Sequence, residues 1–435
     1  MAGALDLKYK NGREISVGRT SQLNSVQRFA AFLAVVWLVL QMDTFISWFF
    51  PSIIIFGTSA AVMFAASLLL FSNSLLRLDS KRKSIVLFIV LIFFLNVFKS
   101  DNFLNVLLVV LRYLPLLLYV CWDGRVVEQS YVYFRNFVIF YAVGSTIIVL
   151  LVATGLIEHL PYITMPAQDN VQENAGTTNR IYGVFVVPDS VRGLSTRLSG
   201  PLREGGHFSL FLGITFFIER CVYGRIRLSL FLAGLLTLSP NFLIVFMLSL
   251  LYTSVTNKTI FKTISLFLVG LVAAVGVFFV LPAPVQEQII FTVFERSLSD
   301  ALAAMQDGGL LAALDERTDS LGKLVYEDFA NNASFTEKLL GMPPGDIDPQ
   351  CVLSDYRRLV YIYGYFGLAL ILLLCWSISR INKSVFGICV FLYAVLVILH
   401  RSWMFIGIYI YIVMFMSSCC KFNHLHAKPQ VRWSV

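Results

Sequence analysis

Charged residues are scarce in this 435-residue chain. Asp, Glu, Lys and Arg together make up 14% of it, whereas hydrophobic residues make up 57%. A soluble domain usually carries about 25% charged residues. The composition therefore argues strongly against a water-soluble fold, and equally against a disordered chain, a collagen or a coiled coil.

Motifs for cofactors and metals are also missing. The 7 cysteines lie mostly in or beside apolar runs and form no CxxC pair, so neither disulfides nor a zinc site is indicated. The chain has no Walker A motif, no GxGxxG, no GxSxG in triad order and no HExxH. We expect no cofactor, no metal and no coupling to ATP. The N-terminal stretch to Thr20 is polar, and we expect no cleaved signal peptide.

What the chain does have is long apolar runs. A helix needs about 20 apolar residues to cross the hydrocarbon core of a bilayer. Twelve candidate spans lie at 28–50, 52–76, 84–98, 103–122, 134–157, 207–222, 226–239, 240–256, 260–281, 358–377, 384–400 and 402–420. These runs are continuously apolar, which excludes a closed β-barrel. We predict an all-α polytopic membrane protein with 12 transmembrane helices, to within one or two.

The basic residues predict the orientation of these spans. Twenty-one Lys and Arg residues fall in the two tails and in the short connections on the same side of the membrane as the tails. The short connections of the other side hold only Lys99 and Arg401. Positive charge marks the cytoplasmic side, so we expect both termini to be cytoplasmic. This bias also explains the net charge of +8 without a nucleic-acid partner.

Two long segments separate groups of spans on the outer side. The predicted order is an N-tail with five spans (1–157), a first large loop (158–206), four spans (207–281), a second large loop (282–357), and three spans with the C-tail (358–435). We expect amphipathic helices in these loops. In the second loop, two apolar stripes have helical spacing: Ile290, Phe294, Leu298 and Leu302, then Leu321, Leu324, Val325 and Phe329.

Arg112 is the first candidate functional residue, because it interrupts the apolar run 103–122. An unpaired cation at the centre of a bilayer costs at least about 2.5–3.5 kcal/mol, and such residues usually serve a function. The alternatives are a structural ion pair, or a side chain that snorkels to the interface. The remaining runs hold almost no acidic residue, His or Lys near their centres, which disfavours an ion-coupled transporter.

The second candidate is the segment 197–208, which holds Arg197, Arg203, Glu204 and His207 around a Gly-rich turn just before a span. Guanidinium groups bind phosphate oxygens bidentately, and a helix N-terminus adds a positive dipole end. Arg180 and Arg192 add basic character upstream. The alternative is an interfacial loop with snorkelling arginines.

The third candidate is Arg317 in the acidic second loop. Asp315, Glu316 and Asp319 flank it, so a surface ion pair is the competing explanation. Further on, the stretch 341–345 (Gly-Met-Pro-Pro-Gly) predicts a turn.

These features together resemble the bacterial O-antigen and capsular polysaccharide polymerases of the Wzy type, which are related to the O-antigen ligases. The resemblance covers the topology of the whole chain and four loose fragments: Arg197-x-Ser199-Gly200 followed by Glu204 and Phe208; Leu238-Ser239; Arg317 followed by Gly341 and Gly345; and Tyr361 to Gly367. Gly205 stands where the family often has Pro. No His occurs between His207 and His400, where the ligases typically have one, and this favours a polymerase.

The resemblance implies a GT-C-like helical bundle in the bacterial inner membrane, with both large loops periplasmic. It also implies a reaction that joins oligosaccharide repeat units carried on undecaprenyl pyrophosphate, with a chain-length regulator and a flippase as partners in the pathway. The implied catalytic residues are Glu204, Arg203 and Arg317, and the implied substrate-binding residues are Arg112, Arg180, Arg192, Arg197 and His207. An O-antigen ligase that transfers glycan to lipid A-core and a lipid-linked oligosaccharide flippase are the alternatives.

Overall fold

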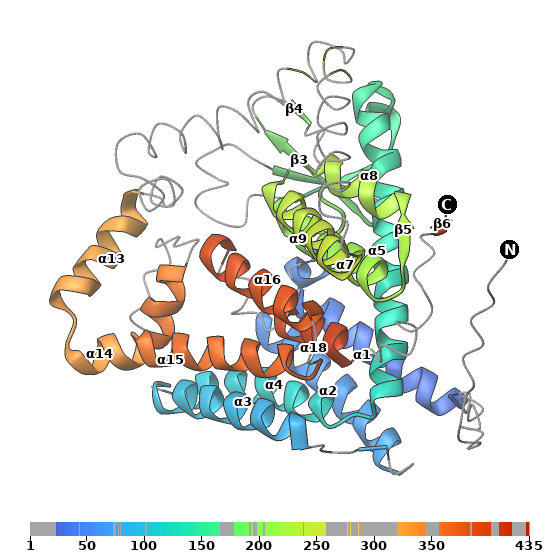
Figure 1. Cartoon of the computed structure of the whole chain (residues 1–435). Helices are drawn as coiled ribbons and strands as arrows, with labels where there is room; N and C mark the ends of the chain where they lie inside the picture. The colour runs from blue at the N-terminus through green and yellow to red at the C-terminus, as the bar shows by residue number, and fades with distance from the viewer. Residues whose placement is uncertain are drawn as a thin grey trace, which may run out of the picture.

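The computed structural model of the chain is mostly helical, with a four-stranded and a two-stranded sheet beside the helices (Figure 1). It describes residues 23–42, 44–72, 75–76, 78, 80–100, 102–165, 178–190, 193–194, 198–202, 205–237, 239–257, 276, 279, 286, 320–343, 356–382, 385–401, 409–419 and 432–434.

The first half of the chain supplies helices α1 to α5 of the bundle and the four-stranded sheet. Its elements are α1 (Ser25–Gln41), the 3-10 helix η1 (Phe45–Phe49), α2 (Ser52–Phe71), α3 (Ser80–Phe98), α4 (Phe103–Val120), α5 (Gly124–Ala153) and η2 (Leu156–His159). Strands β1 (Ile163–Met165), β2 (Thr178–Tyr182), β3 (Phe185–Ser190) and β4 (Gly193–Leu194) follow.

The second half adds α7 (Gly205–Cys221), β5 (Arg225–Arg227), α8 (Leu228–Leu236) and α9 (Pro240–Asn257). After these come α13 (Ser320–Asn332), α14 (Phe335–Leu340), α15 (Tyr356–Ser379), α16 (Val385–Arg401), α18 (Tyr409–Cys419) and β6 (Arg432–Ser434).

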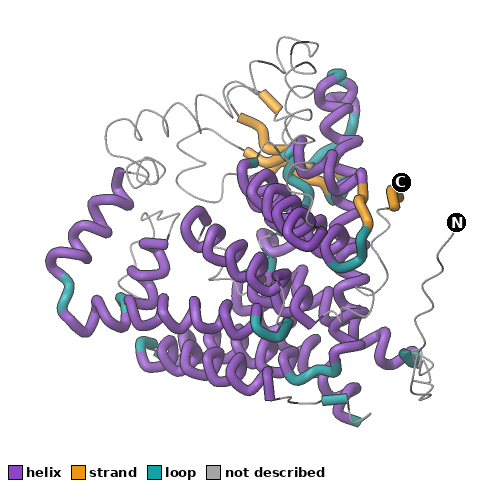
Figure 2. The backbone as a smooth tube through the Cα atoms, in the orientation of Figure 1, coloured by secondary structure: helices purple, strands orange, loops and turns teal. Residues whose placement is uncertain are grey.

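The helices alternate in direction, so the bundle has two distinct ends. Where α2 and α4 end, Leu76 pairs with Trp122 and the Asp123 amide donates to the Leu75 carbonyl. We call this the basic end, because Lys81, Arg82, Arg125 and Arg380 lie there. The opposite end, where α1, α3 and α5 end, is the loop end: the four-stranded sheet adjoins α5 there and α14 adjoins α15, and these two parts lie well apart from each other (Figure 2).

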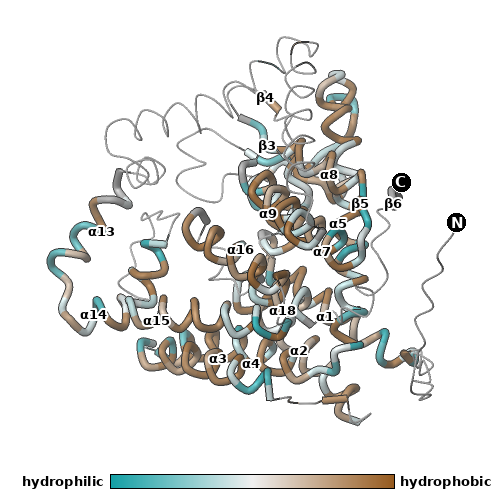
Figure 3. The backbone as a smooth tube through the Cα atoms, in the orientation of Figure 1, coloured by the Kyte–Doolittle hydropathy of each residue, from teal (hydrophilic) through white to brown (hydrophobic). Residues whose placement is uncertain are grey.

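Four helices among the described residues are long and apolar enough to cross a membrane: α2, α4, α5 and α15. The helices α1, α9 and α16 are also apolar but shorter. Figure 3 shows apolar residues along most of α2, α3, α4 and α15. Large side chains on these helices face outward, among them Phe64, Phe71, Phe94 and Phe98. This is the surface of a helical membrane protein.

The predicted runs and the observed helices agree closely in the first half. Each run from 28–50 to 240–256 overlaps a helix, although the bounds of the two differ, most of all for the runs 28–50, 134–157 and 226–239. Of the run 260–281, only positions 276 and 279 are described, and the run 402–420 is described from 409 to 419. The total of 12 spans therefore stays a prediction.

The run 226–239 does not form a complete span. Its helix, α8, has 9 residues, which corresponds to a length of about 13.5 Å at 1.5 Å per residue. That is less than half of the ~30 Å hydrocarbon core. Gly234 allows the close approach that makes this short helix pack well, because a Cβ there would lie 2.2 Å from the Phe242 ring of α9. Its Leu236 carbonyl accepts a hydrogen bond from the Leu198 amide at the loop end.

The first long segment contains a sheet, so the expectation of helices there was wrong for its described residues. Strands β1 to β4 form an antiparallel meander, with β2 paired to β3 from Tyr182 opposite Phe185. Gly183, with φ of 65°, opens the two-residue turn between them. The flanking residues are β-branched or aromatic, which favours strands. Phe185 anchors the sheet to α5, where its ring fills the space above Gly144.

The second long segment is helical where it is described, as predicted. Helix α14 begins with a capping box, in which Ser334 and Glu337 satisfy each other's backbone amides. In α13, Phe329 is buried and Val325 packs beside it, but Leu324 is 63% exposed and lies off the buried face. The first stripe, Ile290 to Leu302, lies outside the described residues.

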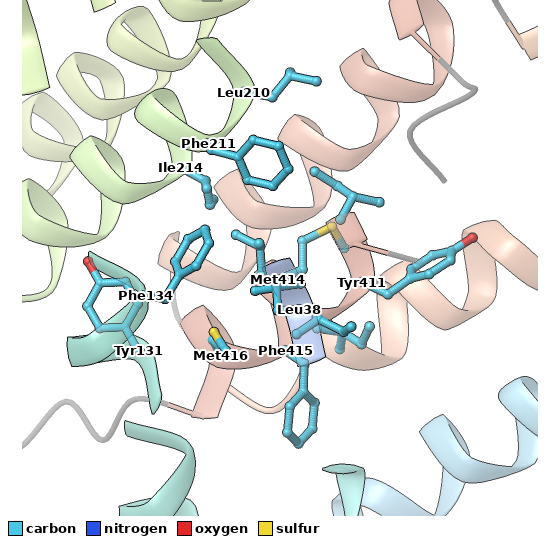
Figure 4. Packing of buried hydrophobic residues seen from close by; sticks show 14 of the residues in the cluster. Leu38, Tyr131, Phe134, Leu210, Phe211, Ile214, Tyr411, Met414, Phe415 and Met416 are labelled. Atoms are coloured by element: carbon cyan, nitrogen blue, oxygen red, sulfur yellow. The ribbon is translucent and has the colours of Figure 1, made fainter. Parts of the chain in front are cut away.

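Helix α18 occupies the centre of the bundle. Its residues 410–418 are all buried, and it contacts α1, α5, α15 and α16. Figure 4 shows Tyr411, Met414, Phe415 and Met416 among residues of α7 and α5 such as Phe211 and Phe134. The core is therefore built around a late segment of the chain, against which earlier helices pack.

Two buried charged groups at the basic end are satisfied internally. Arg82 donates to the Val120 carbonyl at 3.2 Å and to the Trp122 carbonyl, so it caps the C-terminus of α4. Glu219, whose side chain is 0% exposed, accepts from Arg227 at 2.8 Å and from Arg135 and Tyr131 at 3.3 Å each. This acidic group in the last turns of α7 is matched by two guanidinium groups.

Replacing Glu219 with Gln should lower the free energy of unfolding by about 3–5 kcal/mol, since it leaves two arginines without their carboxylate in a buried site. The matched control is Glu327→Gln on the exposed side of α13, which should change stability by no more than about 0.5 kcal/mol. The measurement is unfolding by denaturant in mixed micelles. Equal losses of stability in both variants would contradict the role assigned to Glu219 and its two arginines, Arg135 and Arg227.

Candidate functional site

The turn at residues 198–202 is buried at the loop end and held from three sides. The Val186 amide of β3 donates to the Gly200 carbonyl at 2.9 Å. The Phe45 amide of η1 donates to the Pro201 carbonyl at 3.0 Å, and Thr44 pairs with Leu202. The sheet, the connection between α1 and α2, and α8 therefore all fix this turn.

Glycine is required in this turn by both conformation and space. Gly200 has φ of 63°, which L-residues with side chains rarely adopt. A Cβ at this position would lie 2.8 Å from the ring of Phe208, which is fully buried in α7. The Ser-Gly pair of the sequence motif thus forms a tightly packed turn directly before α7.

The first turns of α7 gather buried polar side chains. Ser209 donates to the Gly206 carbonyl and lies 3.0 Å from the Ser239 hydroxyl. Asn241, at the start of α9, donates to the same carbonyl. His207, predicted to bind substrate, is 8% exposed in this group. The side chain of Ser199 is 1% exposed, and its hydroxyl has no hydrogen-bond partner among the described residues.

Arg112 lies in the middle of α4, as predicted, and no described carboxylate pairs with it. Its Nε is buried without a hydrogen-bond partner in the described part of the chain. The guanidinium carbon lies 4.8 Å from the ring centroid of Phe56 in α2. The ring face stabilises the cation but leaves its hydrogen-bonding capacity unused.

Two buried tyrosines beside Arg112 were not identified from the sequence. Tyr113 of α4 and Tyr363 of α15 hydrogen-bond to each other, and the charge of Arg112 acts on both hydroxyls. The Asn96 amide of α3 donates to the Tyr113 hydroxyl at 3.3 Å. Three helices thus contribute polar groups near one half-buried cation. The only available signal was the tyrosine content of the runs, which does not distinguish such a cluster from ordinary core.

Arg180 has partners of its own within the sheet. Its Nη2 lies 2.6 Å from Oδ2 of Asp189 on the neighbouring strand, and its guanidinium carbon lies 4.6 Å from the Tyr162 ring centroid. This ion pair fixes the guanidinium on the surface of the sheet and neutralises it. Its predicted role in substrate binding is untested.

Five predicted site residues, Arg192, Arg197, Arg203, Glu204 and Arg317, lie outside the described residues. Their roles and their convergence therefore stay predictions. The described residues adjacent to four of them, 193, 198, 202 and 205, belong to the sheet, the buried turn and the start of α7.

The comparisons with known proteins give no relative. No family model, no curated protein and no solved structure matches the chain.

The Gly200→Ala variant should lose about 1–3 kcal/mol of stability, because the residue must adopt a left-handed conformation and displace Phe208. Gly57→Ala is the matched control. Gly57 lies inside α2, and no other atom lies within 4 Å of the place that a Cβ would take there. Alanine at Gly57 should therefore be neutral or stabilising by about 0.5–1 kcal/mol. Denaturant unfolding measures both. A harmless Gly200→Ala change would contradict the packing of the turn.

Proposed function

We propose that this protein is a metal-independent membrane glycosyltransferase. It polymerises oligosaccharide repeat units that are carried on undecaprenyl pyrophosphate into O-antigen or capsular polysaccharide. The reaction takes place at the periplasmic face of the bacterial inner membrane. The support comes from the fragments that resemble Wzy-type polymerases and from the arrangement of described groups at the loop end.

The observation that carries the proposal is the unmatched charge of Arg112. The other buried or half-buried arginines described above have a carboxylate or a helix C-terminus as partner, whereas the contact described for Arg112 is with the ring of Phe56. A cation in this position costs at least about 2.5–3.5 kcal/mol. A phosphate group supplies both the missing negative charge and the acceptors for the guanidinium donors.

The position of Arg112 supports the same proposal. The connection between α1 and α2 contacts the buried turn through Phe45 and Pro201. In the helix that follows, Phe56 contacts Arg112. One short stretch of chain therefore links Arg112 to the turn that is flanked in sequence by Arg197 and Arg203.

The proposed reaction is a nucleophilic substitution at the anomeric carbon of the donor glycan. An acceptor sugar hydroxyl forms the new C–O bond, and the bond between the anomeric carbon and the diphosphate breaks. The lipid diphosphate leaves with the electron pair, and Glu204 or water takes the hydroxyl proton. Charge grows on the diphosphate in the transition state, where fixed guanidinium groups of Arg112, Arg203 and Arg317 stabilise it. General-base help contributes about 10²–10⁴-fold.

The distribution of charge supports the proposed orientation. The described basic residues Lys81, Lys83, Arg125 and Arg380 are exposed at the basic end. If the basic end is cytoplasmic, the loop end faces the periplasm, where lipid-linked repeat units are joined. A chain-length regulator and a flippase of the same pathway are the proposed partners.

The test is an Arg112→Met replacement in a deletion strain that is complemented with the gene. Methionine fills similar volume without charge, so we expect unchanged or higher stability and chain elongation lower by about 100-fold. Surface glycan on a gel should collapse to single repeat units. Arg112→Lys should be intermediate, because lysine keeps the charge but not the planar fork. Arg225→Met, at the exposed β5 position of the basic end, is the matched control.

The outcomes separate the alternatives. Full-length ladders from Arg112→Met would overturn the role of Arg112. Long polymer that accumulates on carrier lipid in the deletion strain would indicate a ligase. Repeat units that remain on the cytoplasmic side would indicate a flippase.

A further inference from the structure

Helix α15 is broken inside its apolar stretch. Gly364 has φ of 68° and ψ of 177°, and helical geometry resumes on either side of it. A break of this kind leaves carbonyl groups of the preceding turn without their intrahelical donors. In a membrane helix, such groups must find other partners.

The freed carbonyls receive donors from two distant parts of the chain. The ammonium group of Lys99, directly after α3, donates to the Ile362 carbonyl and lies 5.8 Å from the ring centroid of Tyr363. The Met342 amide, directly after α14, donates to the Tyr361 carbonyl at 2.8 Å. Two of the carbonyls before the break, those of Tyr361 and Ile362, are thereby satisfied.

Two glycines allow the backbones to meet at this point. A Cβ on Gly341 would lie 2.3 Å from the Ile362 carbonyl oxygen, and a Cβ on Gly364 would lie 2.2 Å from the Leu339 carbonyl oxygen. A side chain at either glycine would therefore collide with the backbone of the other segment. Both have positive φ, at 85° and 68°.

The contact continues into α13. The ring of Phe329 packs against Tyr361 at 5.4 Å, and the guanidinium carbon of Arg357 lies 5.9 Å from the Tyr326 ring centroid. The second long segment is therefore fastened to the turns of α15 that precede the break. The residue after the Ile362 carbonyl is Tyr363, whose hydroxyl hydrogen-bonds to Tyr113 beside Arg112.

We propose that Lys99, Gly341 and Gly364 form a junction that positions Tyr363 beside Arg112, and that Lys99 is a positioning residue of this site. The junction links the second long segment to the buried cation through one backbone contact. The role of Lys99 in catalysis rests on the proposed function. The junction itself is a structural claim that does not depend on it.

The charge of Lys99 is essential to this arrangement. Burial lowers the pKa of Lys99 to about 8. The other charged groups of the elements packed around it are Arg112 on α4, Arg357 and Arg358 on α15, and Glu337 and Lys338 on α14. Glu337 is engaged by Ser334 in its capping box. Lys99 is thus protonated at pH 7 and loses its charge as the pH rises through about 8, which weakens the hydrogen bond to the Ile362 carbonyl.

The first experiment measures hydrogen exchange at the Met342 amide in purified protein reconstituted in lipid. Lys99→Met should speed this exchange by about 10- to 100-fold, the effect of losing one charge-assisted hydrogen bond. Lys99→Arg should restore slow exchange. Lys81→Met is the matched control, because Lys81 donates to the Ile381 carbonyl at the opposite end of α15. Unchanged exchange in Lys99→Met would overturn the junction.

The second experiment measures chain elongation against pH with the same proteins. The wild type should lose kcat above about pH 8, the pKa of Lys99. Lys99→Arg should keep its activity there, and Lys99→Met should have low kcat at every pH with little change in the KM for donor. If the kcat of Lys99→Arg also falls above about pH 8, the positioning role is refuted. If the wild type has no polymerase activity, the proposed function fails while the exchange result still decides the junction.

Discussion

The need to give every buried cation a partner shapes this structure at both ends. At the basic end, Arg82 meets the carbonyls at the end of α4, and Arg135 and Arg227 meet Glu219. Arg112, in the middle of α4, and Lys99, at the loop end, contact aromatic rings and one backbone carbonyl, with no described carboxylate beside them. The buried charges of the basic end are therefore paired with groups of the protein, whereas these two cations have no described anionic partner.

Close approach at glycines then decides where the loop-end groups lie. Gly200 brings the first long segment against α7, and Gly341 and Gly364 bring the second against α15. Side chains at these positions would hold the segments apart by the thickness of a methyl group or more. Both long segments are thus fastened to membrane helices near the start of each helix. Local glycine geometry and long-range placement of charge are parts of the same arrangement.

Sequence alone predicts the features that depend on local composition. A run of apolar residues identifies a helix such as α2, and a solitary arginine within a run identifies Arg112. The features that were missed depend on partners distant in the chain. Lys99 and Ile362 are 263 residues apart, and Arg135 and Glu219 are 84 residues apart. The sheet had a local signal, because Gly183 separates two β-branched and aromatic stretches. The arginines of the same segment instead indicated an anion-binding loop. The break in α15 had only a glycine within an apolar run, a pattern that many unbroken membrane helices share.

The magnitudes also bear on whether Arg112 serves packing or binding. Its insertion costs at least about 2.5–3.5 kcal/mol, whereas a desolvated contact with one ring returns about 2 kcal/mol. Weak hydrogen bonds to neutral hydroxyls add about 1 kcal/mol each where they form, and its Nε forms none with the described residues. If Arg112 had only a structural role, the energy returned by its contacts would at best equal the cost of placing it in the membrane. Each charge-assisted bond to a phosphate oxygen returns about 1.5–3 kcal/mol, so two such bonds exceed the deficit. This comparison supports the proposal that Arg112 binds an anion.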